Sequence, residues 1–417
     1  MKKALRYLGR LWFLILLSLF VWHAGVSYAG NPVMGAKSTA MGTAFSAIAD
    51  DPSAIASNPA GITQLTGTNI YGGPTFVIPS TTFKSPSGQR EKTEFQIFYP
   101  PQLYLTSDAA GKDFVVGLGI FSPFGIGGRK WNSDGLTRYL SVKDQVATVD
   151  INPTVAYRVS PSLSVGFGFD AMYSKKEASK KVNQSLLGAA DGDAALKADG
   201  WGVGFNAGIL FTPVERLSFG LAYRSKVKIR HDGHIDLDNI APPLQSLFGD
   251  SGFRTDVSTT MTFPDIITLG AAYRPSNDIT LSLEIEEVRW SSFKNADIDV
   301  EHKIPQAGFT DTSTNLNWRD SWLFKAGAEY KVSERLSLRG GYAYIQTPVP
   351  ESTLDPGNPD SNQHNVSVGF GYKTGKNVID FFYMAGFYTN RKVENNILSG
   401  AYNNFVHYTG VSVGHKF

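Results

Sequence analysis

The stretch that decides the fold is SLSVGFGFDAMY, residues 162–173. Large apolar side chains stand at every second position, and glycine, serine or a single charge fills the positions between them. Side chains alternate between the two faces of a β-strand, so this pattern predicts a strand with one apolar face and one small or polar face. The stretches ITLSLEIE, residues 279–286, and NVSVGFGY, residues 365–372, repeat the pattern.

Soluble sandwiches show the same alternation, so the ends of the strands decide between that class and a membrane barrel. Aromatic and basic residues at one level are typical of a membrane interface. We therefore expect strands whose apolar face meets lipid, with Phe167, Leu281 and Phe370 facing outward. Four strands close with such a pair before a tight turn: Tyr157-Arg158, Tyr273-Arg274, Tyr330-Lys331 and Tyr372-Lys373.

Short and long connections alternate along the chain. Stretches such as YRVSPSLSV and YKVSERLSL place only a few turn-forming residues between two strands. Short turns at one end and long loops at the other are the pattern of outer-membrane barrels, in which the short turns are periplasmic. The expected long connections are 79–93, 122–143, 174–199, 232–255, 291–317, 347–361 and 390–401.

These boundaries predict fourteen strands and the fold class of an all-β, 14-stranded antiparallel outer-membrane barrel. A single-chain bacterial barrel with both chain ends in the periplasm needs an even number of strands, and closure removes the sheet edges that lipid would not tolerate. The expected strands are 69–78, 94–106, 113–121, 144–158, 161–173, 200–212, 215–231, 256–274, 277–290, 318–331, 334–346, 362–373, 376–389 and 402–417.

The first 29 residues have the composition of a secretory signal peptide. Four basic residues stand within the first ten positions, the apolar run 11–22 follows, and small residues precede a cleavage site after Ala29. The apolar run is shorter than the ~20 residues that a spanning helix needs. We expect export and a mature chain that starts at Gly30.

Charge and cysteine content exclude several classes of protein. The formal charge is +2, and removal of the four signal-peptide cations leaves −2, which gives no indication of nucleic-acid binding. The chain has no cysteine. We therefore expect no disulfide framework, no thiolate metal site and no cysteine nucleophile, and we predict no cofactor.

Two local patterns resemble catalytic or metal-binding motifs. Gly410-Val-Ser412-Val-Gly414 has the spacing of a nucleophile elbow, but the elbow needs a helix after its strand and here the chain ends three residues later. His231 and His234 lack further ligand-type residues at metal-site spacing, and we expect them in an exposed loop. The sequence therefore predicts no catalytic residue, no metal site and no enzyme activity.

Residues 35–62, GAKSTAMGTAFSAIADDPSAIASNPAGI, differ from the rest of the chain. They are rich in alanine, and small residues let helices pack closely in a confined space. Ser53 is a candidate helix cap, and Pro59 ends the helix at Asn58. Such a segment either hangs in the periplasm or fills the lumen. Because an unfilled lumen of this size would be an open hole, we expect residues 30–65 to plug it.

The last strand carries a terminal aromatic residue. In YTGVSVGHKF, residues 408–417, Val411 and Val413 alternate toward Phe417, although His415 departs from the strict pattern. A terminal aromatic on an amphipathic last strand is the usual signal for the barrel-assembly machinery. Phe417 is therefore the predicted assembly signal.

The stretch ADDPSAIASNPAG, residues 49–61, resembles the FadL family of outer-membrane transporters for long-chain fatty acids and other hydrophobic compounds. The similarity covers nearly the whole mature chain, and the loop at 350–372 is closer to the TodX-like members for aromatic hydrocarbons. It implies a signal peptide over 1–29, a hatch over 30–65 that plugs the lumen, and a 14-stranded barrel over 66–417. The other stretches that carry the resemblance are 202–229, 263–275, 289–293 and 318–344.

The resemblance implies passive diffusion of a ligand that is captured between extracellular loops, held next to the hatch, and released sideways near a kink in strand 3. The corresponding hatch motif is Asn58, Pro59 and Ala60, and we expect Asn58 to bond backbone of the kinked third strand. The kink candidates are Gly117, Gly119 and Pro123. The ligand-capture candidates are Leu186, Leu187, Leu244, Leu247 and Phe248.

The expected ligands are long-chain fatty acids or similar hydrophobic compounds, and the alternative is uptake of aromatic hydrocarbons. A non-transporting structural or adhesive barrel is the less favoured reading. The other expected partners are outer-membrane lipids, detergent in structures and the barrel-assembly machinery, without nucleic acid. We expect a monomer in the outer membrane of a Gram-negative bacterium. The sequence leaves open the ligand, the position of the kink and the strand ends.

Overall fold

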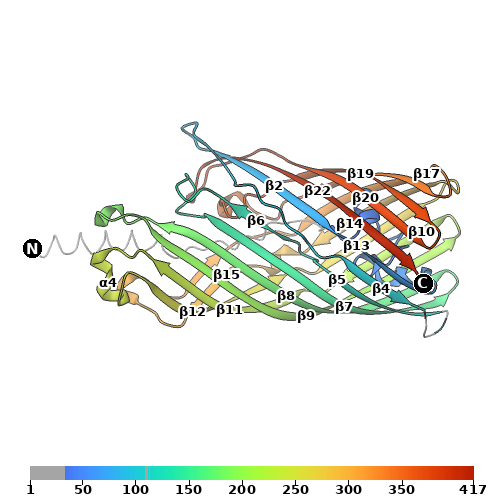
Figure 1. The fold of residues 1–417 in the computed structure, drawn as a ribbon, viewed down its shortest axis with the longest axis horizontal. Helices are drawn as coiled ribbons and strands as arrows, with labels where there is room; N and C mark the ends of the chain where they lie inside the picture. Colours follow the sequence, from blue (N-terminus) through green and yellow to red (C-terminus); the bar gives the residue numbers. More distant parts are fainter. Residues whose placement is uncertain (1–32, 109–110, 112) are drawn as a thin grey trace, which may run out of the picture.

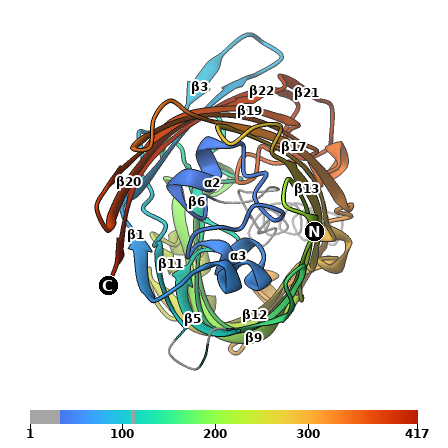
Figure 2. The same ribbon diagram turned by 90° about the vertical axis from the view of Figure 1, so that its right-hand side faces the viewer.

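The computed structural model describes residues 33–108, 111 and 113–417. One antiparallel sheet closes on itself around the N-terminal part of the chain (Figure 1, Figure 2). Closure is made by β1 (Thr68–Gly72) and β2 (Thr75–Lys84), which both pair with the last strand, β22 (Gly400–Lys416). The barrel has 14 strands, as the sequence predicted. The predicted signal peptide, 1–29, lies outside the described residues.

Several of the fourteen barrel strands are interrupted, so the sheet contains 22 regular segments. In the first half these are β3 (Arg90–Lys92), β4 (Leu103–Ser107), β5 (Phe114–Phe121), β6 (Ile126–Lys130), β7 (Lys143–Ser160), β8 (Leu163–Val182), β9 (Gly192–Val214), β10 (Leu217–Arg224) and β11 (Val227–Asp238). In the second half they are β12 (Phe253–Phe263), β13 (Ile266–Tyr273), β14 (Ile279–Val288), β15 (Asn295–Val300), β16 (Thr312–Asn315), β17 (Ser321–Lys331), β18 (Leu336–Ile345), β19 (Gln363–Thr374), β20 (Asn377–Tyr388) and β21 (Arg391–Val393).

The helices of the described part are short. Three lie before the first strand: α2 (Ala36–Ala40), α3 (Ala54–Ser57) and the 3-10 helix η1 (Pro59–Gln64). The others lie in connections between strands: η2 (Ser185–Leu187), α4 (Pro242–Phe248), η3 (Trp290–Ser292), η4 (Pro305–Ala307) and η5 (Glu351–Thr353). A helix of the length and apolarity needed to cross a bilayer is not found among the described residues.

The two faces of the wall follow the predicted alternation. Phe167, Leu281 and Phe370 face outward with 50%, 44% and 40% of their surface exposed, which confirms the prediction for these residues. Phe167 stacks on Phe205 of the neighbouring strand, with ring centroids 5.7 Å apart. Inward-facing Ser164 is buried. The outer surface is therefore apolar over much of its height, as a lipid-facing surface must be.

Several strands run further than predicted. The predicted loop 174–199 is mostly strand, because β8 continues to Val182 and β9 begins at Gly192. Charged side chains of these strands pair across the sheet: Lys143 with Glu177, and Lys181 Nζ with Asp193 at 2.6 Å. Cross-strand ion pairs of this kind stabilise a hairpin outside the membrane.

Three further local predictions are wrong. The predicted loop 291–317 contains strands β15 and β16. The predicted strand 94–106 is regular only from Leu103 onward. His231 lies in β11 and is fully buried rather than exposed in a loop. Strands β15 and β16 form because β15 pairs with both β12 and β16, and a single sequence gives no sign of these partners.

An arginine placed at Phe167 should destabilise the barrel by about 2–4 kcal/mol, because the position faces the hydrocarbon region. Ser179→Arg is the matched control, since Ser179 lies on the same strand and face but beyond the membrane, between Lys143 and Ala195. Ser164→Arg is not a neutral control, because Thr63 donates a hydrogen bond to Ser164 Oγ (2.8 Å). Unfolding by urea in lipid vesicles measures both variants. Equal losses of unfolding free energy in Phe167→Arg and Ser179→Arg would contradict the assignment of Phe167 to the lipid face.

Candidate functional site

The segment formed by residues 33–65, here named the lumenal segment, lies inside the ring of strands (Figure 2). It sits toward the end that carries the short turns and the C-terminus (Figure 1). Its apolar side chains, among them Met41, Phe45 and Ile55, are buried. Small side chains allow two helices and a 3-10 turn to fold within this confined space. Residues 30–32 of the predicted plug lie outside the described residues.

Glycines of the barrel wall form the seat of the lumenal segment. A Cβ atom added at Gly166 would lie 2.4 Å from the backbone of Pro59 and Ala60. Added at Gly220 or Gly341, it would lie 2.3 Å from Ser46 O or 2.0 Å from Gly42 N. We name this set the glycine socket: Gly166, Gly208, Gly220, Gly270, Gly327 and Gly341.

The socket glycines are neighbours across the sheet. Gly166 pairs with Gly208, Gly220 with Gly270, and Gly327 with Gly341. Side-chain atoms are absent from both members of each pair, so the backbone of the lumenal segment approaches the backbone of the wall. The small residues predicted on the inner face of the strands therefore allow the lumenal segment to pack against the wall.

The predicted hatch motif forms the turn between α3 and η1. Asn58 is fully buried, and its Nδ2 donates to Ser46 O at 2.8 Å and to Ile209 O at 3.0 Å. Its Oδ1 accepts from Ala60 N at 3.2 Å, while Pro59 occupies the first position of η1. The expectation that Asn58 bonds the third strand is wrong, because Ile209 belongs to β9.

The third barrel strand meets the lumenal segment through α3. An added Cβ at Gly117 would lie 2.8 Å from Ile55 Cδ1, and one at Gly119 would lie 2.9 Å from Ile55 Cγ2. Both glycines lie within the regular strand β5. Pro123, the third kink candidate, lies in the interruption between β5 and β6, where Gly125 has a positive φ of 79°.

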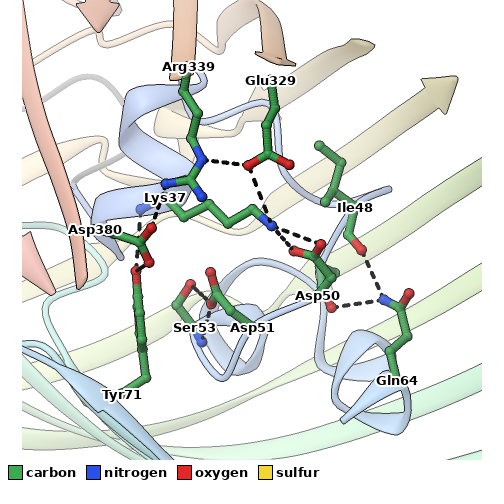
Figure 3. Close-up of polar contacts among 11 residues, drawn as sticks. Lys37, Ile48, Asp50, Asp51, Ser53, Gln64, Tyr71, Glu329, Arg339 and Asp380 are labelled. Atoms are coloured by element: carbon green, nitrogen blue, oxygen red, sulfur yellow. Dashed lines mark hydrogen bonds and ion pairs between the residues drawn. The ribbon is translucent and has the colours of Figure 1, made fainter. Parts of the chain in front are cut away.

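A chain of charges joins the lumenal segment to the wall (Figure 3). Lys37 Nζ lies 2.7 Å from Asp50 Oδ1 and 4.0 Å from Glu329 Oε2 of β17. Burial alone would lower the pKa of Lys37, but the carboxylates of Asp50 and Glu329 raise it above its usual value. Lys37 is therefore a buried cation that bridges the segment and the wall.

The chain continues along the wall. Arg339 Nε lies 2.6 Å from Glu329 Oε2, and Arg339 Nη1 lies 2.5 Å from Asp380 Oδ1 (Figure 3). Tyr71 donates its hydroxyl to Asp380 Oδ2 at 3.0 Å. Each buried charge thus has an opposite charge or a donor, which buried ions require.

Glu284 of β14 also holds the segment. Glu284 Oε2 accepts from the backbone N–H groups of Phe45 (3.1 Å) and Ser46 (2.8 Å), and Glu284 Oε1 accepts from Lys325 (3.0 Å). These bonds fix the middle of the lumenal segment to β14 and β17.

Arg224 holds the end of α3. Its Nη1 lies 2.6 Å from Asp170 and 3.2 Å from Asp150, and its Nη2 donates to Ala56 O at 3.3 Å. Asn206 Nδ2 donates to Ile55 O at 2.7 Å. The carbonyl end of α3 is thereby bound directly to β9 and β10, and through Arg224 it is linked to the carboxylates of β7 and β8.

The cavity beside the lumenal segment is small and partly polar. Its volume is about 40 Å³, room for a few water molecules at most. Arg224, Glu284 and Glu286 line it together with Met34 and Pro59. A long hydrophobic ligand does not fit this cavity without rearrangement of the segment or the side chains around it.

Large aromatic side chains occupy the lumen on the loop side of the segment. Beyond Gly270 toward the loops come the inward-facing Ile266 and then Phe263, the last residue of β12. Its ring lies 4.9 Å from Phe124, and Trp290 lies 5.2 Å from Trp318. We name Phe124, Phe263, Trp290, Phe293 and Trp318 the aromatic cluster. Sequence reasoning did not identify it, because its members come from one strand end and three separate interruptions of the sheet.

Four of the five predicted capture residues lie in one apolar cluster of the loops. Leu244 and Phe248 of α4 are buried, and Leu187 and Leu247 pack against the same cluster. Phe248 and Phe309 have ring centroids 6.2 Å apart. Leu186 does not join them, since 68% of its surface is exposed.

The remaining motifs lie in the wall. Ser412 belongs to β22, no helix follows it, and its Oγ accepts from Ala36 N at 3.1 Å. Phe417 is 64% exposed, and its N–H donates to Thr68 O at 2.9 Å. No group of three or more possible metal ligands is found among residues 33–108, 111 and 113–417.

Comparison with known proteins places this architecture among transport proteins. Residues 14–415 match the family described as outer membrane protein transport protein (OMPP1/FadL/TodX). A long-chain fatty acid transport protein of Escherichia coli O6:H1 is 27% identical over 256 residues, which are 55% of this chain and 56% of that protein. The match therefore spans little more than half the length of that relative.

Solved structures share the fold. A Pseudomonas aeruginosa FadL homologue superimposes with a TM-score of 0.81 at 19% identity, over 93% of this chain and 99% of that one. The Ralstonia pickettii toluene transporter TbuX superimposes with a TM-score of 0.71 at 20% identity, over 92% and 98%. These likenesses show the fold.

Gly166→Ala should loosen the lumenal segment without preventing barrel assembly. The added methyl would overlap the backbone of Pro59 and Ala60, and overpacking of this kind costs about 1–3 kcal/mol. Gly340→Ala is the control, since the nearest atom would be Ser367 O at 3.9 Å. We expect faster proteolysis near Ala44 in Gly166→Ala alone. Equal digestion of both variants would contradict the socket.

Asp51→Asn should stabilise the protein near neutral pH. Burial raises the pKa of Asp51 to about 6, against the attraction of Lys37. A carboxyl whose pKa is raised by folding contributes stability below its unfolded pKa of 3.8, and loses it as the pH rises through about 6. The gain on substitution is on the order of 3 kcal/mol above pH ~7 and vanishes below pH ~4.

Urea unfolding of wild type and Asp51→Asn at both pH values measures this difference. Asp50→Asn is the control, because it removes the partner of Lys37 and should lower stability at neutral pH. A pH-independent difference between wild type and Asp51→Asn would show that Asp51 is not buried as described.

Proposed function

Because the chain belongs to the outer membrane protein transport family (OMPP1/FadL/TodX), we propose that it lets long-chain fatty acids or similar hydrophobic compounds cross the outer membrane by passive diffusion. The family consists of transport channels rather than enzymes, and its members are proteins of the outer membrane of Gram-negative bacteria. The observation that carries the proposal is a lumenal segment inside the barrel with the aromatic cluster on its loop side.

The ligand class follows from the side chains along the lumen. The side chains of the loop cluster around Leu244 and Phe248 would supply apolar contacts for capture once they separate, and those of the aromatic cluster would supply the next apolar contacts. Each buried CH₂ group contributes about 0.8 kcal/mol, so an acyl chain needs few polar contacts to bind. A water-filled pore would give such a molecule no comparable gain.

Binding next to the lumenal segment requires movement. The aromatic cluster is closely packed, and the cavity beside Arg224 and Glu284 has a volume of only about 40 Å³. We propose that the ligand enters by displacing aromatic side chains and then shifts the lumenal segment, which has the role of a hatch. The division into signal peptide, hatch over 30–65 and barrel over 66–417 is part of this proposal.

A sideways exit is supported by weak pairing between barrel strands two and three. Near the turn end, residues 103–107 pair with 116–120. Beyond this ladder, the described residues 94–102 and 121–130 share one backbone hydrogen bond, from Glu94 N to Lys130 O at 2.8 Å. Pro123 lies in the facing interruption. We propose that the ligand leaves the lumen between these segments.

Aromatic hydrocarbons are the alternative ligand class. The aromatic cluster would suit flat rings, which stack on or meet the edges of other rings. Among the solved structures with this fold is a toluene transporter. Uptake of labelled oleate and toluene by liposomes that contain the protein distinguishes the two ligand classes. A protein that carries neither would support the structural or adhesive barrel.

Asn58→Ala should slow uptake while the barrel still assembles. The substitution leaves Ser46 O and Ile209 O without their donor, and an unpaired buried polar group costs about 1–3 kcal/mol. Asn69→Ala is the control, since Asn69 bonds only nearby turn carbonyls, Thr66 O and Gly67 O. Oleate uptake by liposomes and resistance to warm detergent are measured together. Wild-type uptake by an assembled Asn58→Ala barrel would contradict a hatch controlled by Asn58.

A further inference from the structure

Four cations gather on the outer face at the loop end, where β2, β3, β21 and β22 lie side by side. The register places Lys392 opposite Ala401, Ala401 opposite Lys84, and Lys84 opposite Arg90. Lys92 follows two residues after Arg90 and so faces the same side. We name Lys84, Arg90, Lys92 and Lys392 the basic row. Figure 2 shows the β2–β3 hairpin projecting beyond the ring of strands.

The basic row is not neutralised within the described part of the chain. All four side chains are exposed, and no ion pair joins any of them to a carboxylate among the described residues. The nearby Glu94 pairs with Lys130 at 2.5 Å, and Glu91 accepts from Thr137 N at 3.1 Å. Like charges on adjacent strands repel one another. Their arrangement therefore favours an anionic partner.

An apolar groove lies directly below the basic row on the same outer face. Its lining includes Ile78, Phe95, Tyr383, Phe405 and His407, and its volume is about 690 Å³. Lys92 of the basic row also lines it, so the groove and the cations form one continuous surface. We name it the outer groove.

The outer groove lies at an aromatic level of the barrel. Phe405 lies 5.1 Å from Phe387 and 4.6 Å from His407, measured between ring centroids. The hydroxyl of Tyr383 and Nδ1 of His407 are 2.7 Å apart. Such amphipathic rings sit where acyl chains meet headgroups. The groove is thus at the depth of acyl chains and the basic row at the depth of headgroups.

We propose that the basic row and the outer groove bind one lipid of the outer leaflet that carries phosphate groups and several acyl chains, of the lipid A class. The phosphates contact Lys84, Arg90 and Lys92, with Arg90 suited to two parallel bonds to one phosphate. The acyl chains lie in the outer groove. This lipid site lies on the outer face of the barrel, and Glu94 and Phe95, which line the outer groove, also belong to the segment beside the proposed exit.

The test uses the full-length protein in mild detergent, with bound lipid counted by native mass spectrometry. The probes are bisphosphorylated lipid A, dephosphorylated lipid A, phosphatidylethanolamine and inorganic phosphate. We expect one tightly bound lipid A, at least tenfold weaker binding of the dephosphorylated lipid and of phosphatidylethanolamine, and no competition by millimolar phosphate. This result requires both the phosphates and the acyl chains.

The variant Lys84→Gln/Arg90→Gln/Lys92→Gln should weaken lipid A binding at least about tenfold. The matched control removes the same charge at the turn end, Lys331→Gln/Arg335→Gln/Lys373→Gln, and should change binding less than threefold. Heat-modified gel mobility reports assembly of both triple variants. Should the first triple not assemble, Lys84→Gln alone replaces it, with about threefold weakening expected.

Ser80→Trp tests the outer groove separately, because Ser80 lines it and leaves the cations in place. We expect it to reduce lipid A binding. Equal binding by the two triple variants, or equal binding of phosphorylated and dephosphorylated lipid, would overturn the proposal. Competition by free phosphate at the same site would show an anion site without a lipid.

Discussion

Close backbone contact between the lumenal segment and the glycine socket is the constraint on which the rest of this structure depends. A fourteen-stranded ring is too wide for wall side chains to fill, so a separate piece of chain must do it. The paired glycines remove side chains where that piece touches the wall. Sheet glycines lose packing and conformational entropy, and here the contact with Asn58, Ser46 and Met41 compensates that loss.

The buried charges place the segment in one orientation. Lys37 of the segment lies beside Glu329 of the wall, while Glu284 and Arg224 of the wall bond backbone groups of two other parts of the segment. Buried ion pairs add little net stability but penalise any arrangement that leaves one charge alone. The glycine contacts thus let the segment approach the wall closely, and the ion pairs fix its orientation. A segment held at three places suits the proposed role of a hatch over a hydrophobic route.

The strands and their faces were predictable from sequence because alternation is local. Phe167 and Phe370 needed only their own neighbours, and so did the small-residue plug. The partner of Asn58 was not predictable, since Ile209 lies 151 residues away in sequence. The aromatic cluster was missed for the same reason. The strands of the extended hairpins were read as loops because their charges pair only across the sheet. In each case the missing information is a contact between distant segments.

In the proposed mechanism, passage of a hydrophobic ligand requires the lumenal segment to move relative to the wall. A disulfide between Ala47→Cys and Gly270→Cys tests this directly in a chain that has no other cysteine. A Cβ at Gly270 would lie 3.4 Å from Ala47 Cβ, close to the separation found in disulfides. Uptake of labelled oleate by liposomes is measured before and after reduction, with each single variant as control. We expect oleate uptake by the oxidised protein to be blocked and reduction of the disulfide to restore it. Wild-type uptake by the fully oxidised protein would contradict this mechanism.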